Sequence, residues 1–176
     1  MVIGPQHSCT RLFVALLDVH PDVEGVMHLS MPSSGKMRSI REYFVGCDRM
    51  LIVSRDRCAI NLSNLRDYKI PLDDDIAGAA CKAMRDELGA MLRPDAALWR
   101  RVHFASFDAL INYRDVYLRH VLAGLGLEPA KYPTLASLEG QTRTPKDSLG
   151  GPLWFSVELT LHDSNEKYYN LPGRTP

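Results

Sequence analysis

The chain carries no excess charge of either sign, because its 21 lysines and arginines are balanced by 21 aspartates and glutamates. A neutral chain has no overall field that would draw it to nucleic acid or to an acidic membrane surface, although a local basic patch is compatible with this balance. It also lacks any apolar run near the roughly 20 residues that cross a bilayer. It has no basic and apolar leader of the secretory type. We therefore expect a cytoplasmic protein with no membrane partner.

Cysteine is scarce, and the four that occur have no metal-binding pattern. Cys9, Cys47, Cys58 and Cys81 form no C-x-x-C pair and have no metal-like spacing with histidine. Isolated thiols of this kind are typical of a reducing compartment, where they are mostly buried as small apolar side chains. The sequence therefore predicts reduced, mostly buried cysteines and no metal site.

Aromatic residues are few, at 8%, but hydrophobic residues make up 45% and charged residues 24% of the chain. These are the proportions of an ordinary globular domain, and 176 residues suffice to build one core. From residue 128 to residue 152 the composition shifts to Pro, Gly, Ser, Thr and Lys, which indicates a long loop. We therefore expect a single domain over residues 1–176, with residues 128–152 as a long loop or lid.

Short apolar segments alternate with helical patterns along the chain. The expected strands are Met1–Ile3, Gly25–Ser30, Met50–Ser54, Arg101–Ser106 and Leu153–Leu159. The expected helices are Thr10–Val19, Lys36–Val45, Asp73–Leu92 and Phe107–Leu125. This alternation predicts an α/β fold with a mostly parallel sheet and helices on both faces. Ligands of such sheets bind at the carboxyl ends of the strands.

The first strand turns directly into a helix through a short polar segment. Such a turn aims free backbone N–H groups and the positive end of the helix dipole at one point, which suits a phosphate or a sulfate. The residues expected to form this anion cradle are Gly4, Gln6, His7, Ser8, Cys9, Thr10 and Arg11. The alternative is a strand–helix turn with no ligand.

This turn departs from the Walker form G-x-x-x-x-G-K-[ST], in which a lysine reaches the terminal phosphates and a hydroxyl residue holds magnesium. When the turn is aligned on Gly4, Cys9 replaces the second glycine, Thr10 the lysine and Arg11 the hydroxyl residue. An ordinary ATPase or GTPase is therefore not expected.

The opening G-P-Q-H-S-C-T-R-L-F-V-A-L-L-D-V-H-P-D-V resembles that of the P-loop sulfotransferase family. In that family a P-[RK]-S-G-T-[ST] loop leads into a helix that ends L-L-x-x-H-P-x-V. The matching residues are Ser8, Thr10, Leu16, Leu17, His20, Pro21 and Val23. In the loop, His7 stands in place of the basic residue, Cys9 in place of the glycine and Arg11 in place of the second hydroxyl residue.

Two later segments resemble the same family, in the same order along the chain. In I-V-S-R-D-R-C-A-I-N-L-S, Arg55 ends a strand and Ser63 follows eight residues on. The resemblance implies that this pair holds the 3′-phosphate of 3′-phosphoadenosine 5′-phosphosulfate. In the next strand and helix, the residues in register with the family's Y-E-D-L segment are Ser106, Phe107, Asp108 and Leu110.

Transfer of a group to a hydroxyl needs a cation for the charge that develops on the bridging oxygen, and usually a base for the acceptor. Arg11 or His7 would supply the positive charge. His28, expected at the tip of the second strand, is the candidate base because an imidazole titrates near neutrality. Ser30 lies on the same side of that strand by its period of two. The alternatives are a solvated Arg11 and a His28 held by structural hydrogen bonds.

Two further groups of residues carry suitable chemistry. Lys36 and Arg38, in S-S-G-K-M-R, are candidates for binding a phosphate or the acceptor, or else belong to a solvated loop. Asp56 and Asp108 follow strands, and they are candidates for binding magnesium or acting as bases. An ion pair with a neighbouring arginine is the alternative for Asp56.

These features favour a nucleotide-dependent P-loop transferase that moves a sulfuryl group from 3′-phosphoadenosine 5′-phosphosulfate to a hydroxyl acceptor. The first alternative is a phosphotransferase that uses ATP with Mg²⁺, in which Arg11 or Lys36 replaces the Walker lysine. The short chain and the lack of the family's late basic, glycine-rich adenine clamp favour it. Its acceptor would include a hydroxymethyl base in viral DNA, as in a subset of small P-loop kinases. The second alternative is a catalytically inactive nucleotide-binding protein, which the replacement of glycine by Cys9 favours.

Overall fold

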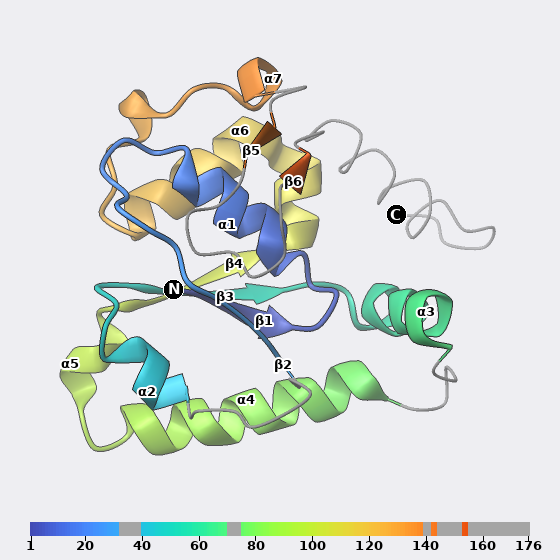
Figure 1. The fold of residues 1–176 in the computed structure, drawn as a ribbon. Helices are drawn as coiled ribbons and strands as arrows, with labels where there is room; N and C mark the ends of the chain where they lie inside the picture. The colour runs from blue at the N-terminus through green and yellow to red at the C-terminus, as the bar shows by residue number, and fades with distance from the viewer. Residues whose placement is uncertain (32–39, 70–74, 139–141, 144–152, 155–176) are drawn as a thin grey trace.

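Four parallel strands form the centre of a computed structural model that describes residues 1–31, 40–69, 75–138, 142–143 and 153–154 (Figure 1). The strands are β1 (Val2–Pro5), β2 (His28–Met31), β3 (Met50–Ser54) and β4 (Val102–Ser106). Their order in the sheet is β2-β1-β3-β4. The chain therefore runs from β1 to β2 on one side of it, and then crosses over to β3 on the other side, as in doubly wound Rossmann-like folds.

The register of the strands brings their carboxyl ends to one edge of the sheet. Val2 pairs with His28 on one side and with Leu51 on the other. Ser54 pairs with Ser106 at the ends of β3 and β4. The segments that leave β1, β3 and β4 consequently emerge next to one another at this carboxyl edge.

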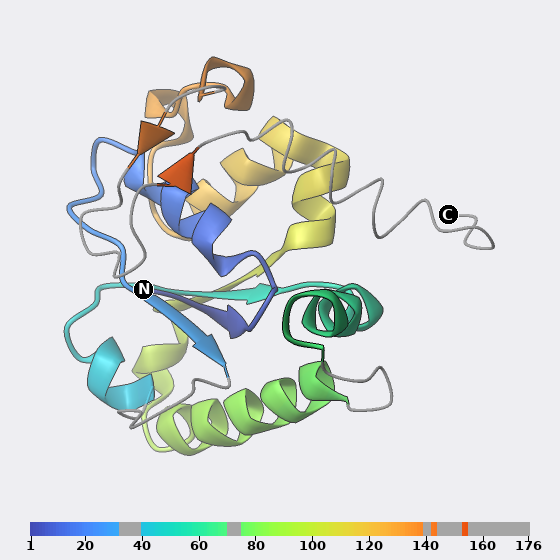
Figure 2. The same ribbon diagram turned by 45° about the vertical axis from the view of Figure 1, so that its right-hand side comes forward.

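Helices cover both faces of the sheet, and the turned view separates the two layers (Figure 2). On one face lie α1 (Thr10–Asp18) and α6 (Phe107–Gly124). On the other lie α2 (Ile40–Phe44) and α4 (Ile76–Leu92). The short α5 (Ala96–Trp99) leads into β4, and α3 (Arg57–Tyr68) lies beyond the carboxyl ends of the strands. Their arrangement confirms the predicted α/β class with helices on both faces of a parallel sheet.

Each helical layer has its own core because successive strand residues point to opposite faces. The strand residues packed with α1 and α6 are Val2, Leu51, Val53 and Ala105. Those packed with α2 and α4 are Ile3, Leu29, Met50, Ile52 and Val102. Burial on both faces explains why β3 is a continuous apolar run, M-L-I-V, and not an alternating pattern.

The polypeptide after α6 is more structured than a bare loop. It contains the 3₁₀ turn η1 (Pro129–Lys131), the short helix α7 (Leu135–Leu138) and two strands, β5 (Thr142–Arg143) and β6 (Leu153–Trp154). These two strands pair antiparallel with each other, apart from the parallel sheet. Of the predicted strand Leu153–Leu159, only the first two residues belong to the described part of the chain.

Several element boundaries differ from the prediction. The strand β3 has the predicted bounds, and β1 is longer than expected because it continues to Pro5. The helix α3 was not predicted: its sequence R-C-A-I-N-L-S-N-L-R-D-Y spreads its few apolar residues without a strong single face. Its start is set instead by Asp56, whose carboxylate accepts a hydrogen bond from the Ala59 amide at 2.9 Å.

The cysteines are free, as predicted, but their predicted burial is wrong. Cys58 and Cys81 are exposed, and Cys9 and Cys47 are half-buried. The two exposed residues lie on α3 and α4, outside the two buried core clusters. Among the described residues, no helix combines the length and the apolar character that crossing a membrane requires.

Candidate functional site

The loops after the neighbouring strands β1 and β3 diverge, because the chain continues from β1 to β2 on one side of the sheet and from β3 to β4 on the other. In an open α/β sheet such a switch point leaves a crevice at the carboxyl edge, where ligands bind. Three segments meet there: the turn of residues 6–9 between β1 and α1, the start of α3 and the start of α6. We call residues 6–9 the β1–α1 turn.

The β1–α1 turn is folded tightly against the end of its own strand. Its Ser8 is fully buried, and both the amide and the hydroxyl of Ser8 donate to the Pro5 carbonyl, at 3.0 and 2.6 Å. Gly4 is required beneath it, because a Cβ atom there would lie 2.7 Å from the Val53 carbonyl and would also meet the Ser8 hydroxyl. The proton of that hydroxyl therefore supports the turn from inside and does not point toward a ligand.

The turn has a left-handed backbone at two residues that are not glycine. His7 and Cys9 have φ angles of 65° and 63°. Cys9 is the N-cap of α1, and no described side chain caps the helix there. The first N–H groups of α1 therefore face the carboxyl edge with the positive end of the helix dipole behind them, and Arg11 is exposed in the same first turn. The left-handed angle of Cys9 occurs where the resembled sulfotransferase loop has glycine.

Arg55, at the end of β3, connects the neighbouring strand to this turn. Its guanidinium donates to the His7 carbonyl at 2.9 Å and to the Cys9 sulfur at 3.7 Å. It also lies over the ring of Phe107, 5.0 Å from the ring centre. Burial raises the pKa of the Cys9 thiol to about 11, against the opposite influence of Arg55. The site thus holds a neutral thiol and a fixed cation side by side.

Asp108, in the first turn of α6, adds a carboxylate to the same edge. One of its oxygens, Oδ2, accepts a hydrogen bond from the Asp56 amide at 2.9 Å. The other, Oδ1, is buried and has no hydrogen-bond partner among the described residues. Burial raises the pKa of Asp108, and Arg55 acts in the opposite direction. Asp108 is therefore a half-buried carboxyl group with one oxygen left for a ligand or a proton.

Asp56 has a structural role. Besides capping α3, its amide fixes Asp108, and the neighbouring Arg57 forms a two-pronged ion pair with Asp75. No cluster of three or more His, Cys, Asp or Glu side chains among the described residues could hold a metal ion.

Thr10, His28 and Ser30 form a compact polar cluster beside the turn. The Thr10 hydroxyl lies 2.7 Å from His28 Nε2 and 3.2 Å from the Ser30 hydroxyl, which is itself 3.0 Å from the same nitrogen. Burial, and secondarily the charge of Arg11, lower the pKa of His28. The cluster is therefore a neutral imidazole hydrogen-bonded to two hydroxyls.

The predicted position of His28 at the strand tip is wrong. β2 begins at His28, opposite Val2, whereas Ser30 lies opposite Gly4 at the carboxyl half of the sheet. The segment from Gly25 to Met27, expected as strand, instead leads into it without strand pairing. His28 reaches the site only because its ring extends to Thr10.

The structure brings together some of the predicted site residues. Arg55 and the β1–α1 turn are in contact, and so are Thr10, His28 and Ser30. Ser63 is buried within α3, and its pairing with Arg55 around a phosphate stays a prediction. Lys36 and Arg38 lie outside the described residues.

The sequence analysis did not predict that Asp108 lies next to Arg55, and it assigned no role to Phe107, which lies beneath the Arg55 guanidinium. The only signal was their place directly after a strand, which puts them at the carboxyl edge. Because Phe107 and Asp108 are far from Arg55 in the sequence, a local pattern could not predict that they lie beside it.

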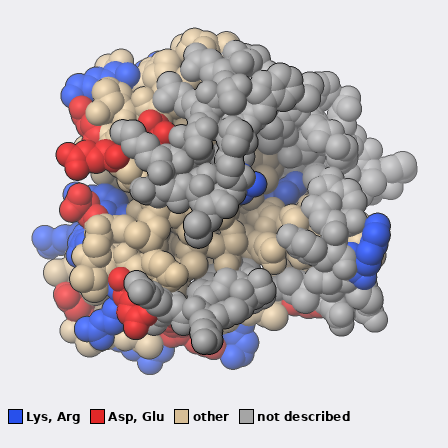
Figure 3. Space-filling view, in the orientation of Figure 1, with Lys and Arg blue, Asp and Glu red and all other residues tan. Residues whose placement is uncertain are grey.

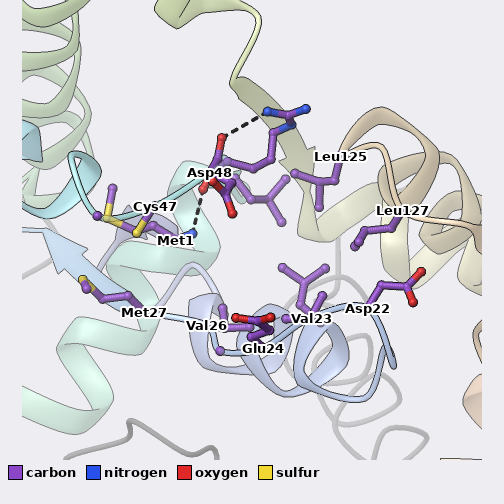
Figure 4. Close-up of a pocket in the computed structure, with 15 residues that line it drawn as sticks. Met1, Asp22, Val23, Glu24, Val26, Met27, Cys47, Asp48, Leu125 and Leu127 are labelled. Atoms are coloured by element: carbon purple, nitrogen blue, oxygen red, sulfur yellow. Dashed lines mark hydrogen bonds between the residues drawn. The ribbon is translucent and has the colours of Figure 1, made fainter.

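A larger cavity, of about 580 Å³, lies at the opposite, amino edge of the sheet (Figure 4). It is lined by the segments that lead into β2 and β3, including Asp22, Glu24 and Asp48, and by Leu125 at the end of α6. Its position is the wrong end of a parallel sheet for a ligand that uses helix N-termini. We therefore place the candidate site at the carboxyl edge.

Lysines and arginines are interspersed with acidic residues on the described part of the face in Figure 3. This distribution agrees with the zero net charge and shows no single-sign patch on that part of the surface.

Comparisons with known proteins do not assign the chain to a family, since no family model, no curated protein and no solved structure matches it.

Proposed function

We propose that the protein is a nucleotide-dependent transferase whose anion site is the β1–α1 turn and whose donor is 3′-phosphoadenosine 5′-phosphosulfate. The observation that carries the proposal is the contact between Arg55 and this turn at the uncapped start of α1. It joins a cation, a helix N-terminus and a switch point in one place. These are the three features that bind a phosphate or a sulfate in α/β folds.

The residues of the site fit the chemistry of sulfuryl transfer to a hydroxyl. The acceptor oxygen forms a bond to sulfur while the bond from sulfur to the bridging oxygen of the donor breaks. In this proposal Arg11, exposed in the first turn of α1, stabilises the charge that remains on the donor. His28, whose pKa is lowered, is the base that takes the acceptor proton on Nε2 after exchanging its hydrogen bonds to Thr10 and Ser30.

Calorimetric titration with 3′,5′-adenosine bisphosphate tests the donor. Arg55→Ala should weaken this ligand by about 10- to 150-fold, the effect of losing a charge-assisted hydrogen bond of 1.5–3 kcal/mol. Arg57→Ala is the matched control, because Arg57 pairs with Asp75 away from the turn and its loss should leave affinity unchanged. ATP lacks the 3′-phosphate that Arg55 and Ser63 are proposed to hold, so binding of ATP with Mg²⁺ should fall much less in Arg55→Ala. Equal losses for both ligands would contradict the sulfuryl donor, and absence of binding in the wild type would reject the nucleotide site.

One observation favours the phosphotransferase as a second candidate. The free Oδ1 of Asp108 is the kind of oxygen that holds Mg²⁺ together with substrate phosphates. If ATP with Mg²⁺ is the donor, Asp108→Asn should abolish the magnesium dependence of ATP binding without changing the affinity for 3′,5′-adenosine bisphosphate. A wild-type affinity for ATP that does not respond to Mg²⁺ excludes this candidate.

A further inference from the structure

An apolar groove of about 350 Å³ opens on the face of the sheet that α4 only partly covers. α4 packs over β1 and β2, and it also covers Val102 at the start of the edge strand β4. Further along β4, no described helix covers Phe104. The groove is lined mainly by Ile52, Met84, Leu88, Leu92, Trp99 and Phe104. We refer to it as the α4–β4 groove.

Two large aromatic side chains of the groove are exposed to solvent. Trp99 on α5 is 50% exposed and Phe104 on β4 is 66% exposed. Val102, Phe104 and Ser106 point to the same face of β4, and Val102 is buried under α4 and α5. Phe104 is left exposed because α5 ends before it and no described helix continues the layer. Exposed aromatic rings that share one concavity mark a binding surface more often than scattered apolar residues do.

The charged groups that line the groove are cations, and Ser54 and Cys81 are its other polar residues. Arg85 on α4 and Arg55 at the end of β3 both line it, and its described lining contains no carboxylate. Arg85 is exposed and forms no ion pair with a described acidic residue. A site with an apolar floor and basic rim complements a molecule with an apolar body and an anionic head.

We propose that the α4–β4 groove binds a small apolar anion, such as a medium-chain or aromatic carboxylate, with its head at Arg85 and its body against Trp99 and Phe104. The volume of the groove matches the lower end of small-molecule sites and is too small for a globular partner. The proposal does not depend on the nucleotide site, because its floor lies on the α4 face of the sheet and its principal cation is Arg85.

Trp99 supplies a direct readout of binding. The chain has two tryptophans, so a Trp154→Phe background leaves Trp99 as the single indole. Titration with octanoate should change the Trp99 emission saturably. Octanol, which has the same body without charge, should bind at least several-fold more weakly, and octylammonium more weakly still. Raising the ionic strength should reduce the affinity for octanoate and leave that for octanol unchanged.

Substitutions then separate the contribution of the charged head to the affinity from that of the apolar body. Arg85→Ala should lower the affinity for octanoate about tenfold, the lower end for a charge-assisted hydrogen bond, to the level of octanol. Lys82→Ala is the matched control, since Lys82 is an exposed cation of the same helix that does not line the groove and pairs with Asp86. Phe104→Ser, at an exposed position that should not affect folding, should weaken all three ligands alike.

Three results would overturn the proposal. The first is equal affinity for octanoate, octanol and octylammonium. The second is octanoate binding that Arg85→Ala leaves unchanged. The third is a concentration-dependent dimer in sedimentation that Phe104→Ser dissociates, which would make a second copy of the chain the occupant. None of these results bears on nucleotide binding, so the two proposals can fail separately.

Discussion

The two edges of the parallel sheet use their polar groups in opposite ways. At the amino edge these groups tie loops together: the Tyr132 hydroxyl donates to the Leu16 carbonyl at 2.7 Å, His20 Nε2 lies 3.0 Å from the Glu128 carbonyl, and Lys131 pairs with Asp22. At the carboxyl edge, α1 begins without a side-chain cap and Asp108 keeps an oxygen without a described partner. A buried nitrogen without a described partner also occurs at the amino edge, on His103 Nε2. What distinguishes the carboxyl edge is therefore the start of α1 beside Arg55 and Asp108.

The largest expected effect is on turnover, and it tests whether the carboxyl edge carries chemistry. His28→Asn keeps a polar group of similar reach but cannot take a proton, so turnover should fall about 10²- to 10⁴-fold, the usual contribution of a positioned general base. Nucleotide affinity should stay nearly unchanged in titration calorimetry. Near-normal turnover of this variant across pH 6–8 would show that His28 has a structural role, and Asp108 would then be the next candidate base.

His28 also predicts a pH dependence of stability. Because the pKa of His28 is lowered from 6.5 in the folded chain, chiefly by burial, the unfolded chain binds this proton more readily. The resulting stabilisation is fully present above pH 6.5 and is lost as pH falls from there through the folded pKa. The urea midpoint of the wild type should therefore drop more between pH 7.5 and 5 than that of His28→Asn. Parallel curves for the two proteins would contradict the lowered pKa.

A pair of glycine substitutions compares the packing of the two edges. Gly4→Ala forces a Cβ atom against the Val53 carbonyl and the Ser8 hydroxyl, so we expect a loss of about 3 kcal/mol in the free energy of unfolding, the upper range for overpacking. Gly46→Ala at the amino edge meets no atom within 4 Å and should be nearly neutral. Denaturant unfolding measures both. Similar stabilities for the two variants would mean that the β1–α1 turn is not packed on β1 as described.

The amino edge can be loosened without touching the proposed chemistry. Tyr132→Phe removes the buried hydrogen bond to the Leu16 carbonyl, so unfolding should become easier by about 1–2 kcal/mol. Nucleotide affinity should not change, because Leu16 is far along α1 from its first turn. A large loss of affinity in this variant would show that the two edges are coupled through α1.

The smallest effect is expected for the ion pair of the amino edge. Lys131 and Asp22 are both substantially exposed, and exposed pairs contribute little to stability. Lys131→Met should leave the thermal midpoint within error at physiological salt. A clear drop that disappears in high salt would show that this pair helps to hold the loop after α1.

Much of the fold was predictable because parallel strands buried on both faces leave a strong sequence signal. The run M-L-I-V-S gave β3 with its bounds, and the β1–α1 turn was predicted from its polar residues between an apolar strand and a helix. The helix α3 was missed because its start depends on the Asp56 cap more than on an apolar face. Within α6, Arg114 has a φ of 44° at a kink in the helix, which could not be predicted because no glycine or proline lies near it in the sequence.

The candidate site was only partly predictable, for a different physical reason. Local pattern identified Arg55 as a cation at a strand end, but its contacts with His7 and Cys9 join residues almost fifty positions apart. The same applies to Thr10 and His28, whose hydrogen bond depends on strand order and register. The α4–β4 groove left no sequence signal, since it results from a sheet that is wider than the helix layer over it.

Because the thiol of Cys9 is protonated and covered, chemical labelling can measure the opening of the β1–α1 turn. With a pKa of about 11, only about one Cys9 in ten thousand is a thiolate at pH 7, and Arg55 covers its sulfur. Iodoacetamide should therefore alkylate the exposed Cys58 and Cys81 long before it reaches Cys9. Any event that opens the turn uncovers this thiol, so the rate of Cys9 alkylation, followed by peptide mass, measures how often the turn opens.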